Sequence, residues 1–185
     1  DDYADSRIKI YDLSGNYTDS IRLGKQPISM TQVGSEVWVG IEDYGRNKIN
    51  RYDLNGNYTG FIDLWNTRND PISMAVVGSE VWVGIEDYDT KIMRYDLDGN
   101  YTDLINIWGS YNYPISMTQV GSEVWVGMYA YDSKIRRYDL NGNYIDFINL
   151  GAGYNNPLSM TQVGSEVWVG MYAYDSKIRR YDLNG

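Results

Sequence analysis

One segment of eight residues, Val-Gly-Ser-Glu-Val-Trp-Val-Gly, occurs four times in this chain of 185 residues. The copies occupy Val33–Gly40, Val77–Gly84, Val120–Gly127 and Val163–Gly170. A proline precedes each copy, at Pro27, Pro71, Pro114 and Pro157, so successive units begin 44, 43 and 43 residues apart. Such a period is typical of architectures in which each unit buries its apolar surface only against a neighbouring unit. Residues 116–142 and 159–185 are identical over 27 positions, which indicates recent duplication or design.

The unit that begins at Pro27 contains four expected strands, A to D, over residues 27–33, 36–43, 48–54 and 57–64. Strand B is apolar on both faces, and Asn55-Gly56 predicts a type I′ turn between strands C and D. No segment has helical periodicity. Four strands in about 43 residues predict an all-β fold, a β-propeller of four-stranded antiparallel blades with about four repeats. A superhelical β-solenoid is the alternative architecture.

We expect a single repeat domain over residues 1–185. Its parts are strands C and D of a partial blade (1–26), full repeats at 27–70, 71–113 and 114–156, and strands A to C of a partial blade (157–185). A four-bladed ring could close through residues 16–23 as the missing strand D, which leaves one strand C redundant. There are two alternatives: strand exchange between chains, or a chain that is a fragment of a longer repeat array. Self-association through exposed strand edges is therefore one expected partnership. Because the chain opens at Asp1 without an initiating Met, we expect a processed or excised piece.

The repeat unit resembles the blades of NHL-type propellers and, more loosely, lactonase-like and YVTN-like propellers. The matching residues are Pro-Ile-Ser-Met-Thr-Gln-Val (27–33), Glu-Val-Trp-Val (36–39) and Lys-Ile-Asn-Arg-Tyr-Asp-Leu-Asn-Gly-Asn (48–57). The resemblance covers the whole chain and implies a blade pattern, which specifies a fold better than an activity.

Composition excludes several kinds of chemistry. The chain has no Cys and no His, which rules out thiolate metal sites, a Cys nucleophile, a Ser-His-Asp triad and His-ligated metals. The net charge of −9 is unfavourable for binding nucleic acid or anionic lipid, and no run is long enough for membrane insertion. We therefore expect a protein that is not an enzyme, with no cofactor and no metal.

Variable aromatic loops are the predicted binding surface. The A–B and C–D turns lie at one end of each blade, and the variable B–C and D–A loops lie at the other. Variable loops on a rigid scaffold are where binding usually occurs, and Tyr and Trp suit sugar rings and protein surfaces alike. Capping of the blade ends is the alternative role of these aromatic residues. The candidate ligand- or partner-binding residues are Tyr44, Trp65, Tyr88, Trp108, Tyr111, Tyr131, Tyr154 and Tyr174.

Other repeated residues are assigned to the core or to ion pairs. The strand B tryptophans, Trp38, Trp82, Trp125 and Trp168, are predicted to pack between blades, and the strand A methionines, Met30, Met74, Met117 and Met160, to line the core or the channel. Glu42, Asp43, Glu86 and Asp87 could form acid–base pairs or a Ca²⁺ site, but nearby lysines offer ion pairs instead. The resemblance to lactonase-like propellers implies acidic residues around a central metal, which keeps a metal-dependent hydrolase as an alternative.

Three N-glycosylation sequons begin at Asn16, Asn57 and Asn100, just after the C–D turns. The fourth copy has Ile145 in place of the threonine. A structural role for Asn in the turn and for Thr in the strand is the alternative. Together these features predict a non-catalytic extracellular or cell-surface propeller that binds glycans or proteins multivalently, or that serves as a structural repeat in a surface assembly. An engineered symmetric propeller without a native ligand is the other alternative.

Overall fold

The computed structural model describes residues 6–43, 46–65, 69–87, 90–108, 112–129, 133–151, 153, 155–172 and 176–185. These residues form strands, turns and connecting segments, and none of them is helical. Accordingly, no helix capable of crossing a membrane occurs in the described part of the chain. The chain divides into two compact units, Asp1–Pro71 and Ile72–Gly185, each of which is described by itself.

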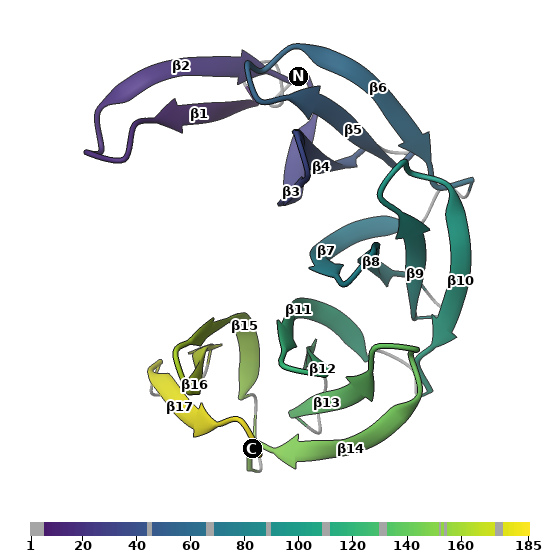
Figure 1. The fold of residues 1–185 in the computed structure, drawn as a ribbon, viewed down its shortest axis with the longest axis vertical. Helices are drawn as coiled ribbons and strands as arrows, with labels where there is room; N and C mark the ends of the chain where they lie inside the picture. Colours follow the sequence, from purple (N-terminus) through teal and green to yellow (C-terminus); the bar gives the residue numbers. More distant parts are fainter. Residues whose placement is uncertain are drawn as a thin grey trace. The chain divides into compact units, whose positions relative to one another are not determined.

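The first unit contains a hairpin and one full sheet (Figure 1). The hairpin pairs β1 (Arg7–Tyr11) with β2 (Tyr17–Arg22). The sheet has the order β3-β4-β5-β6. Its strands are β3 (Gln26–Val33), β4 (Glu36–Glu42), β5 (Lys48–Asp53) and β6 (Tyr58–Asp63). These ranges differ from the four expected strands by at most one residue at each end, which confirms the strand prediction for this repeat.

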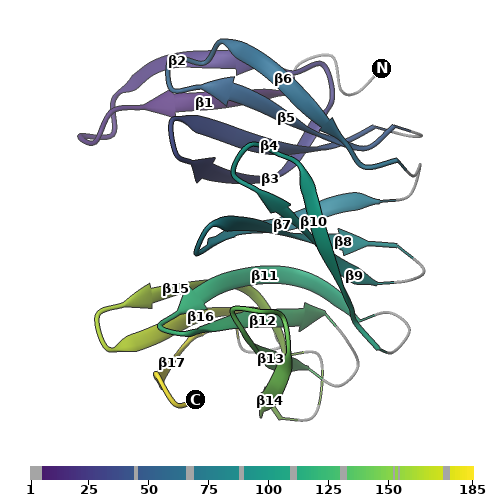
Figure 2. The same ribbon diagram turned by 45° about the vertical axis from the view of Figure 1, so that its right-hand side comes forward.

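The second unit contains two further four-stranded sheets and one three-stranded sheet (Figure 2). The first of these sheets has the order β7-β8-β9-β10, and β7 lies at the boundary between the units. The second has the order β11-β12-β13-β14, and the third has the order β15-β16-β17. Their strands are β7 (Asp70–Val77), β8 (Glu80–Glu86), β9 (Lys91–Asp96), β10 (Tyr101–Asn106), β11 (Tyr113–Val120), β12 (Glu123–Tyr129), β13 (Lys134–Asp139), β14 (Tyr144–Asn149), β15 (Asn156–Val163), β16 (Glu166–Tyr172) and β17 (Ile178–Asp182).

The same antiparallel register recurs from sheet to sheet. In the first full sheet, Trp38 lies opposite Thr31 on one side and opposite Arg51 on the other. Trp125 has the equivalent partners, Thr118 and Arg137. Because strand B is central in every sheet, both of its edges are paired and both of its faces must be covered by apolar contacts. This explains why the sequence has Val-Trp-Val there rather than alternating polar residues.

The C–D turns differ from the predicted type I′ turn. Gly56 has φ +83°, but Asn55 is not in the left-handed region, where a type I′ turn would place it. Asp53 accounts for the difference, because its carboxylate accepts hydrogen bonds from the backbone N–H groups of Asn55 and Asn57 (2.9 and 2.8 Å). The result is a longer connection with a single left-handed residue, the glycine.

Burial separates the last repeat from the others. Trp38, Trp82 and Trp125 are fully buried, as predicted, but Trp168 is 37% exposed. Its sheet, β15–β17, contacts β11–β14 through β15, and no further sheet follows it in the second unit to cover its other face. The prediction of a fully packed position is therefore wrong for Trp168.

The strand A methionines divide in a similar way. Met74 and Met117 are buried, whereas Met30 is 55% exposed. The hairpin before β3 supplies no strand A or B to cover Met30, so the core alternative is wrong for Met30, and its place in a channel stays a prediction.

Candidate binding loops and the contacts between repeats

Trp65 is an exposed aromatic residue in an unfavourable backbone conformation. It follows Leu64, which is buried just after β6, and its own side chain is 73% exposed. Its φ is +52°, the only positive φ of a non-glycine residue in the described part of the chain. At the equivalent position of two other repeats the chain has glycine, Gly24 (φ +67°) and Gly151 (φ +92°). A bulky residue in this region is strained, and such strain is found preferentially at functional sites.

Trp108 is the second described member of the predicted binding set. Its side chain is 83% exposed, while its backbone carbonyl accepts hydrogen bonds from Asn112 Nδ2 (3.1 Å) and Arg136 Nη2 (3.0 Å). The backbone of Trp65 is held as well, because its N–H donates to Asp63 Oδ1 (2.9 Å). Both tryptophans thus present an exposed ring from an anchored backbone.

The other six predicted binding residues lie outside the described residues. They are Tyr44, Tyr88, Tyr111, Tyr131, Tyr154 and Tyr174. Trp65 and Trp108 belong to different units, so each is treated as a separate candidate contact.

Two of the four acidic residues of the B–C loops, Asp43 and Asp87, form ion pairs with lysines. Lys25 Nζ lies 2.9 Å from Asp43 Oδ1, and Lys91 Nζ lies 3.7 Å from Asp87 Oδ2. Within the described ranges, no three His, Cys, Asp or Glu side chains gather in a way that could hold a metal ion. These contacts match the ion-pair interpretation of the acidic residues.

Each sequon asparagine has a structural role in its turn. The Nδ2 atoms of Asn16, Asn57 and Asn100 donate to the Oδ2 atoms of Asp12, Asp53 and Asp96 at 2.8 to 2.9 Å. Asn143 makes the same contact with Asp139 (2.8 Å) although its repeat has no sequon. The turn therefore requires the asparagine whether or not it is glycosylated, and glycosylation stays a prediction.

These turns shift the pKa of their carboxyl groups. Asp12 accepts a side-chain hydrogen bond and a backbone hydrogen bond from Asn16, and these stabilise its charged form and lower its pKa. Equivalent donors lower the pKa of Asp53, Asp96 and Asp139. For Glu36, burial alone would raise the pKa, but hydrogen bonds from Thr59, Arg51 and Trp38 outweigh it and lower the pKa. Each of these groups is thus stabilised in its charged form by the fold.

A contact between successive repeats was missed by the analysis of the sequence. The hydroxyl of Ser29 in strand A donates to the backbone carbonyl of Pro71 in the next repeat. A Cβ built on Gly40 in strand B would lie 2.7 Å from that carbonyl oxygen and 3.0 Å from Pro71 Cγ, so only glycine fits beneath the proline. We call the surface formed by this serine and glycine the Ser–Gly notch.

The second unit repeats this contact at both of its internal junctions. Ser73 donates to the carbonyl of Pro114, and Ser116 donates to the carbonyl of Pro157 (2.5 Å). Gly84 and Gly127 lie beneath those prolines, with built Cβ atoms 2.6 and 2.8 Å from the carbonyl oxygens. The signal was in the sequence, since Ser, Gly and Pro recur at fixed places in each repeat, but their contact across repeats required the structure.

Within the described part of the second unit, no proline lies in the last Ser–Gly notch. A Cβ built on Gly170 would approach only Ser159, the serine of its own sheet. An open cavity of about 370 Å³ lies over this notch, lined by residues that include Leu158, Met171 and Ile178. The fourth notch is therefore a preformed surface exposed on the second unit.

Comparisons with solved structures find similar folds at low sequence identity. A protein of unknown function from Bacteroides caccae matches with a TM-score of 0.66 and 13% identity, over 97% of this chain and 70% of that chain. BamB from Moraxella catarrhalis matches with a TM-score of 0.64 and 14% identity, over 97% of this chain and 53% of that chain. The computationally designed protein Ika4 matches with a TM-score of 0.59 and 16% identity, over 85% of this chain and 91% of that chain.

No family model and no curated protein matches the sequence, so membership of the NHL family stays a prediction. The structural neighbours, which include the propeller protein BamB, show the fold alone. Together with the repeated antiparallel sheets, they confirm the predicted fold class: the chain is an all-β protein with a β-propeller repeat fold.

Proposed function

We propose that this protein is a non-catalytic, extracellular binding module that presents exposed aromatic side chains from the loops between its blades. The observation that carries the proposal is Trp65, which is 73% exposed at a left-handed position where two of the three sister repeats have glycine. An exposed tryptophan gains little from burial, so burial does not offset the strain at this position. A ligand that stacks on the indole would do so.

Glycans are the proposed ligand class. An indole ring offers a flat apolar face to a sugar ring, and two exposed tryptophans in one chain, Trp65 and Trp108, favour multivalent binding, which raises avidity without new contacts. The placement outside the cell rests on the sequons at Asn16, Asn57 and Asn100.

A glycan array probed with the native chain and with Trp65→Gly and Trp108→Ala tests this proposal. The expected result is binding by the native chain that weakens by about fivefold or more in each variant, since a ring stacked on an aromatic side chain contributes about 1 to 3 kcal/mol in nucleic-acid sites. Trp168→Ala, which changes an exposed strand residue away from these loops, is the control and should bind as the native chain does. Absence of glycan binding, or binding by a protein ligand alone, would contradict the proposal.

A structural role in an assembly is a second candidate function. It is favoured by a specific observation, the exposed outer face of β15–β17, where Leu158, Trp168 and Ile178 are 51%, 37% and 64% exposed. Apolar faces of this kind are commonly contact surfaces.

A further inference from the structure

We propose that the Ser–Gly notch of the last repeat, Ser159 and Gly170, binds Pro27 of a second copy of this chain, and that β2 of that copy pairs with the outer edge of β17. The inference rests on the assembly role, the second candidate function above, and it names the partner and the contact. Four features of the described residues support it: the notch, the free edge of β17, the charges along that edge and a threonine contact.

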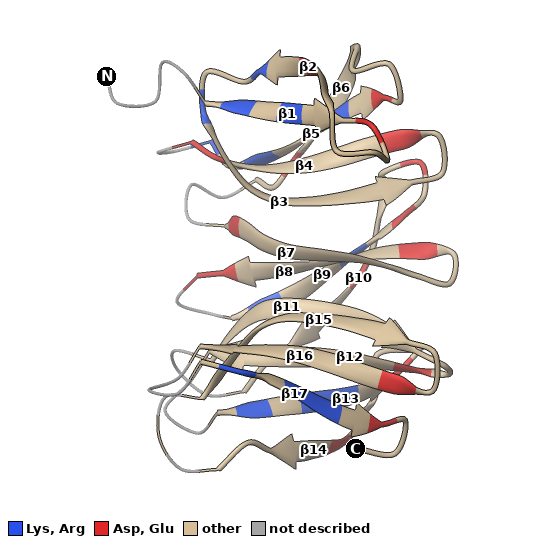
Figure 3. Ribbon diagram, turned by 90° about the vertical axis from the view of Figure 1, so that its left-hand side faces the viewer, with Lys and Arg blue, Asp and Glu red and all other residues tan. Residues whose placement is uncertain are grey.

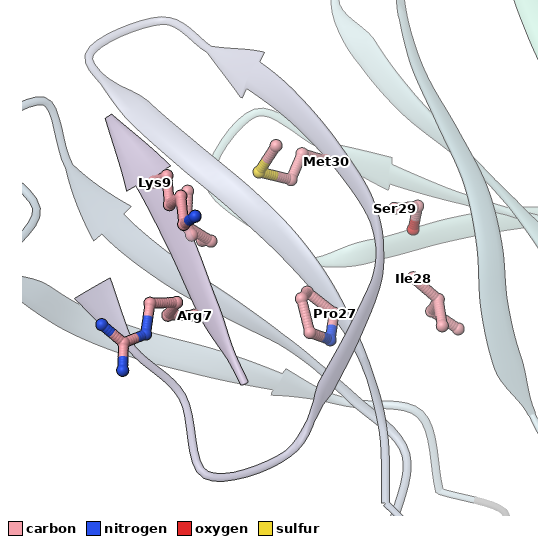
Figure 4. Close-up of a pocket in the computed structure, with 7 residues that line it drawn as sticks. Arg7, Lys9, Pro27, Ile28, Ser29 and Met30 are labelled. Carbon is pink, nitrogen blue, oxygen red and sulfur yellow. The ribbon is translucent and has the colours of Figure 1, made fainter. Parts of the chain in front are cut away.

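The notch is specific for a proline followed by the strand A sequence. The three internal notches each hold such a proline, with the same serine hydrogen bond and the same glycine beneath the ring. Residues 159–185 are identical to 116–142, so the last notch has the same chemistry as the one that holds Pro157. Pro27 is the remaining strand A proline, and in the first unit it lines an open groove of about 430 Å³ between β1 and β3 (Figure 4).

The last sheet also lacks its fourth strand. Strand C pairs with a strand D in the other three sheets, through β6, β10 and β14, whereas β17 pairs only with β16 among the described residues. An unpaired edge has free backbone donors and acceptors and favours addition of a strand. The sequence of β2 is that of a strand D: Tyr17-Thr18 matches Tyr58-Thr59 of β6 and Tyr101-Thr102 of β10.

The charges of β2 match those along the edge of β17 better than they match β1. In the second unit, Arg94 and Arg137 of strand C lie opposite Asp103 and Asp146 of strand D. Arg180 holds that place in β17, and Asp19 holds it in β2; Asp19 now lies opposite Ile10. In Figure 3, blue ribbon segments mark the Lys and Arg positions of β17 and of β13, its counterpart in the preceding sheet.

A threonine contact completes the match. Thr59 and Thr102 of strand D donate to the strand B carboxylates Glu36 (2.8 Å) and Glu80 (2.7 Å). The equivalent strand B residue of the last sheet is Glu166, whose sheet has only β15, β16 and β17 among the described residues. Thr18, which now donates to the carbonyl of Ile10 (3.2 Å), is the equivalent donor in β2.

Docking requires one of two equivalent strands to leave, because β1 and β17 are both strands C. Arg180 of β17 forms an ion pair with Glu166 (2.6 Å) and lies over the ring of Trp168. β1 has Ile10 at that position and can make neither contact. Therefore β17 stays and β1 is released when β2 exchanges partners, so the number of paired strands is conserved.

Matched variants of the whole chain test the proposal. Gly170→Ala places a Cβ where it would collide with the docked carbonyl, and Pro27→Glu removes the docked ring. Gly127→Ala and Pro114→Glu are the controls at occupied internal junctions. We expect the native chain to form species of at least twice the 21.3 kDa chain mass, as measured by light scattering after gel filtration. Gly170→Ala and Pro27→Glu should be folded monomers, and the two controls should lose thermal stability instead.

Mixing the two monomeric variants separates exchange between copies from closure within one chain. Gly170→Ala retains its Pro27, and Pro27→Glu retains its notch. In an equimolar mixture, Pro27 of the first variant can dock in the notch of the second, so we expect a heterodimer that grows no further.

Trypsin should also cleave after Lys9 faster in the native assembly than in either monomeric variant, because β1 is released. A native chain that stays monomeric, or variants that fail to combine, would overturn the proposal and leave the loop-binding proposal intact.

Discussion

Trp65 combines a strained backbone conformation with an exposed side chain. Since its φ of +52° is unfavourable for a residue with a Cβ, Trp65→Gly should raise the free energy of unfolding by about 1 kcal/mol. Urea unfolding of the native and variant chains measures this change. Trp108→Gly is the matched control: Trp108 has no positive φ, so its replacement should give no increase. A loss of stability in Trp65→Gly would show that the indole packs against the fold.

The turn aspartates make stability depend on pH in a definite direction. The pKa values of Asp12, Asp53, Asp96 and Asp139 are lower in the folded chain than in the unfolded chain. The unfolded chain therefore binds more protons, and stability is complete above the unfolded pKa of about 4 and declines as the pH falls through the folded values. Denaturant midpoints should be flat near neutral pH and fall in acid, and the fall should be shallower in Asp53→Asn. Equal midpoints at neutral and strongly acidic pH would contradict this account of the turns.

The central strand of each sheet shows what the sequence could predict at the level of elements. Its Val-Trp-Val run predicted a strand covered on both faces, and Trp38, Trp82 and Trp125 are fully buried. Local pattern could not predict that Trp168, in an identical segment, is exposed, because burial depends on the sheet that follows rather than on the strand itself. The turn type was wrong for a related reason: the Asp53 carboxylate, outside the Asn-Gly pair, determines the geometry.

Two tryptophans in identical sequence therefore allow a matched test of packing between sheets. Trp125→Ala should lower the free energy of unfolding by about 3 to 5 kcal/mol, as expected for a large buried side chain. Trp168→Ala should cost clearly less when both changes are made in the monomeric Pro27→Glu chain, since Trp168 is 37% exposed there while no second copy covers the last sheet. Thermal or urea unfolding of both variants, with circular dichroism to verify the strand content, provides the comparison. Equal costs at the two sites would mean that the last sheet is covered as fully as the others.

Glycosylation is a property of the whole molecule that can be read from its mass. An asparagine side-chain amide has two hydrogens, so Asn57 can carry a glycan on Nδ2 and still donate the remaining hydrogen to Asp53. Expressed in a glycosylating secretory host, the chain should exceed 21.3 kDa, and enzymatic deglycosylation should restore that value. Asn143, which has no sequon, should stay unmodified. A bare mass from such a host would remove the prediction for Asn16, Asn57 and Asn100.

At the level of the molecule, the repeat period predicted the fold class, whereas the contacts that join the repeats were not visible in it. Periodicity reports that units are alike, and it cannot tell which side chains of one unit meet those of the next. The Ser–Gly notch, with the proline of the following repeat above it, supplies that link, and it explains why Gly40, Gly84 and Gly127 interrupt the apolar run of each strand B. It also identifies Gly170 as the position where a further strand A would dock.

A crystal structure of the native chain at side-chain resolution tests the central claim most directly. We expect Pro71, Pro114 and Pro157 to lie over Gly40, Gly84 and Gly127, each accepting a serine hydrogen bond through its carbonyl, and Pro27 of another molecule to lie over Gly170. Sheets whose tryptophan-bearing strands face solvent, or internal glycines with no proline above them, would contradict the account.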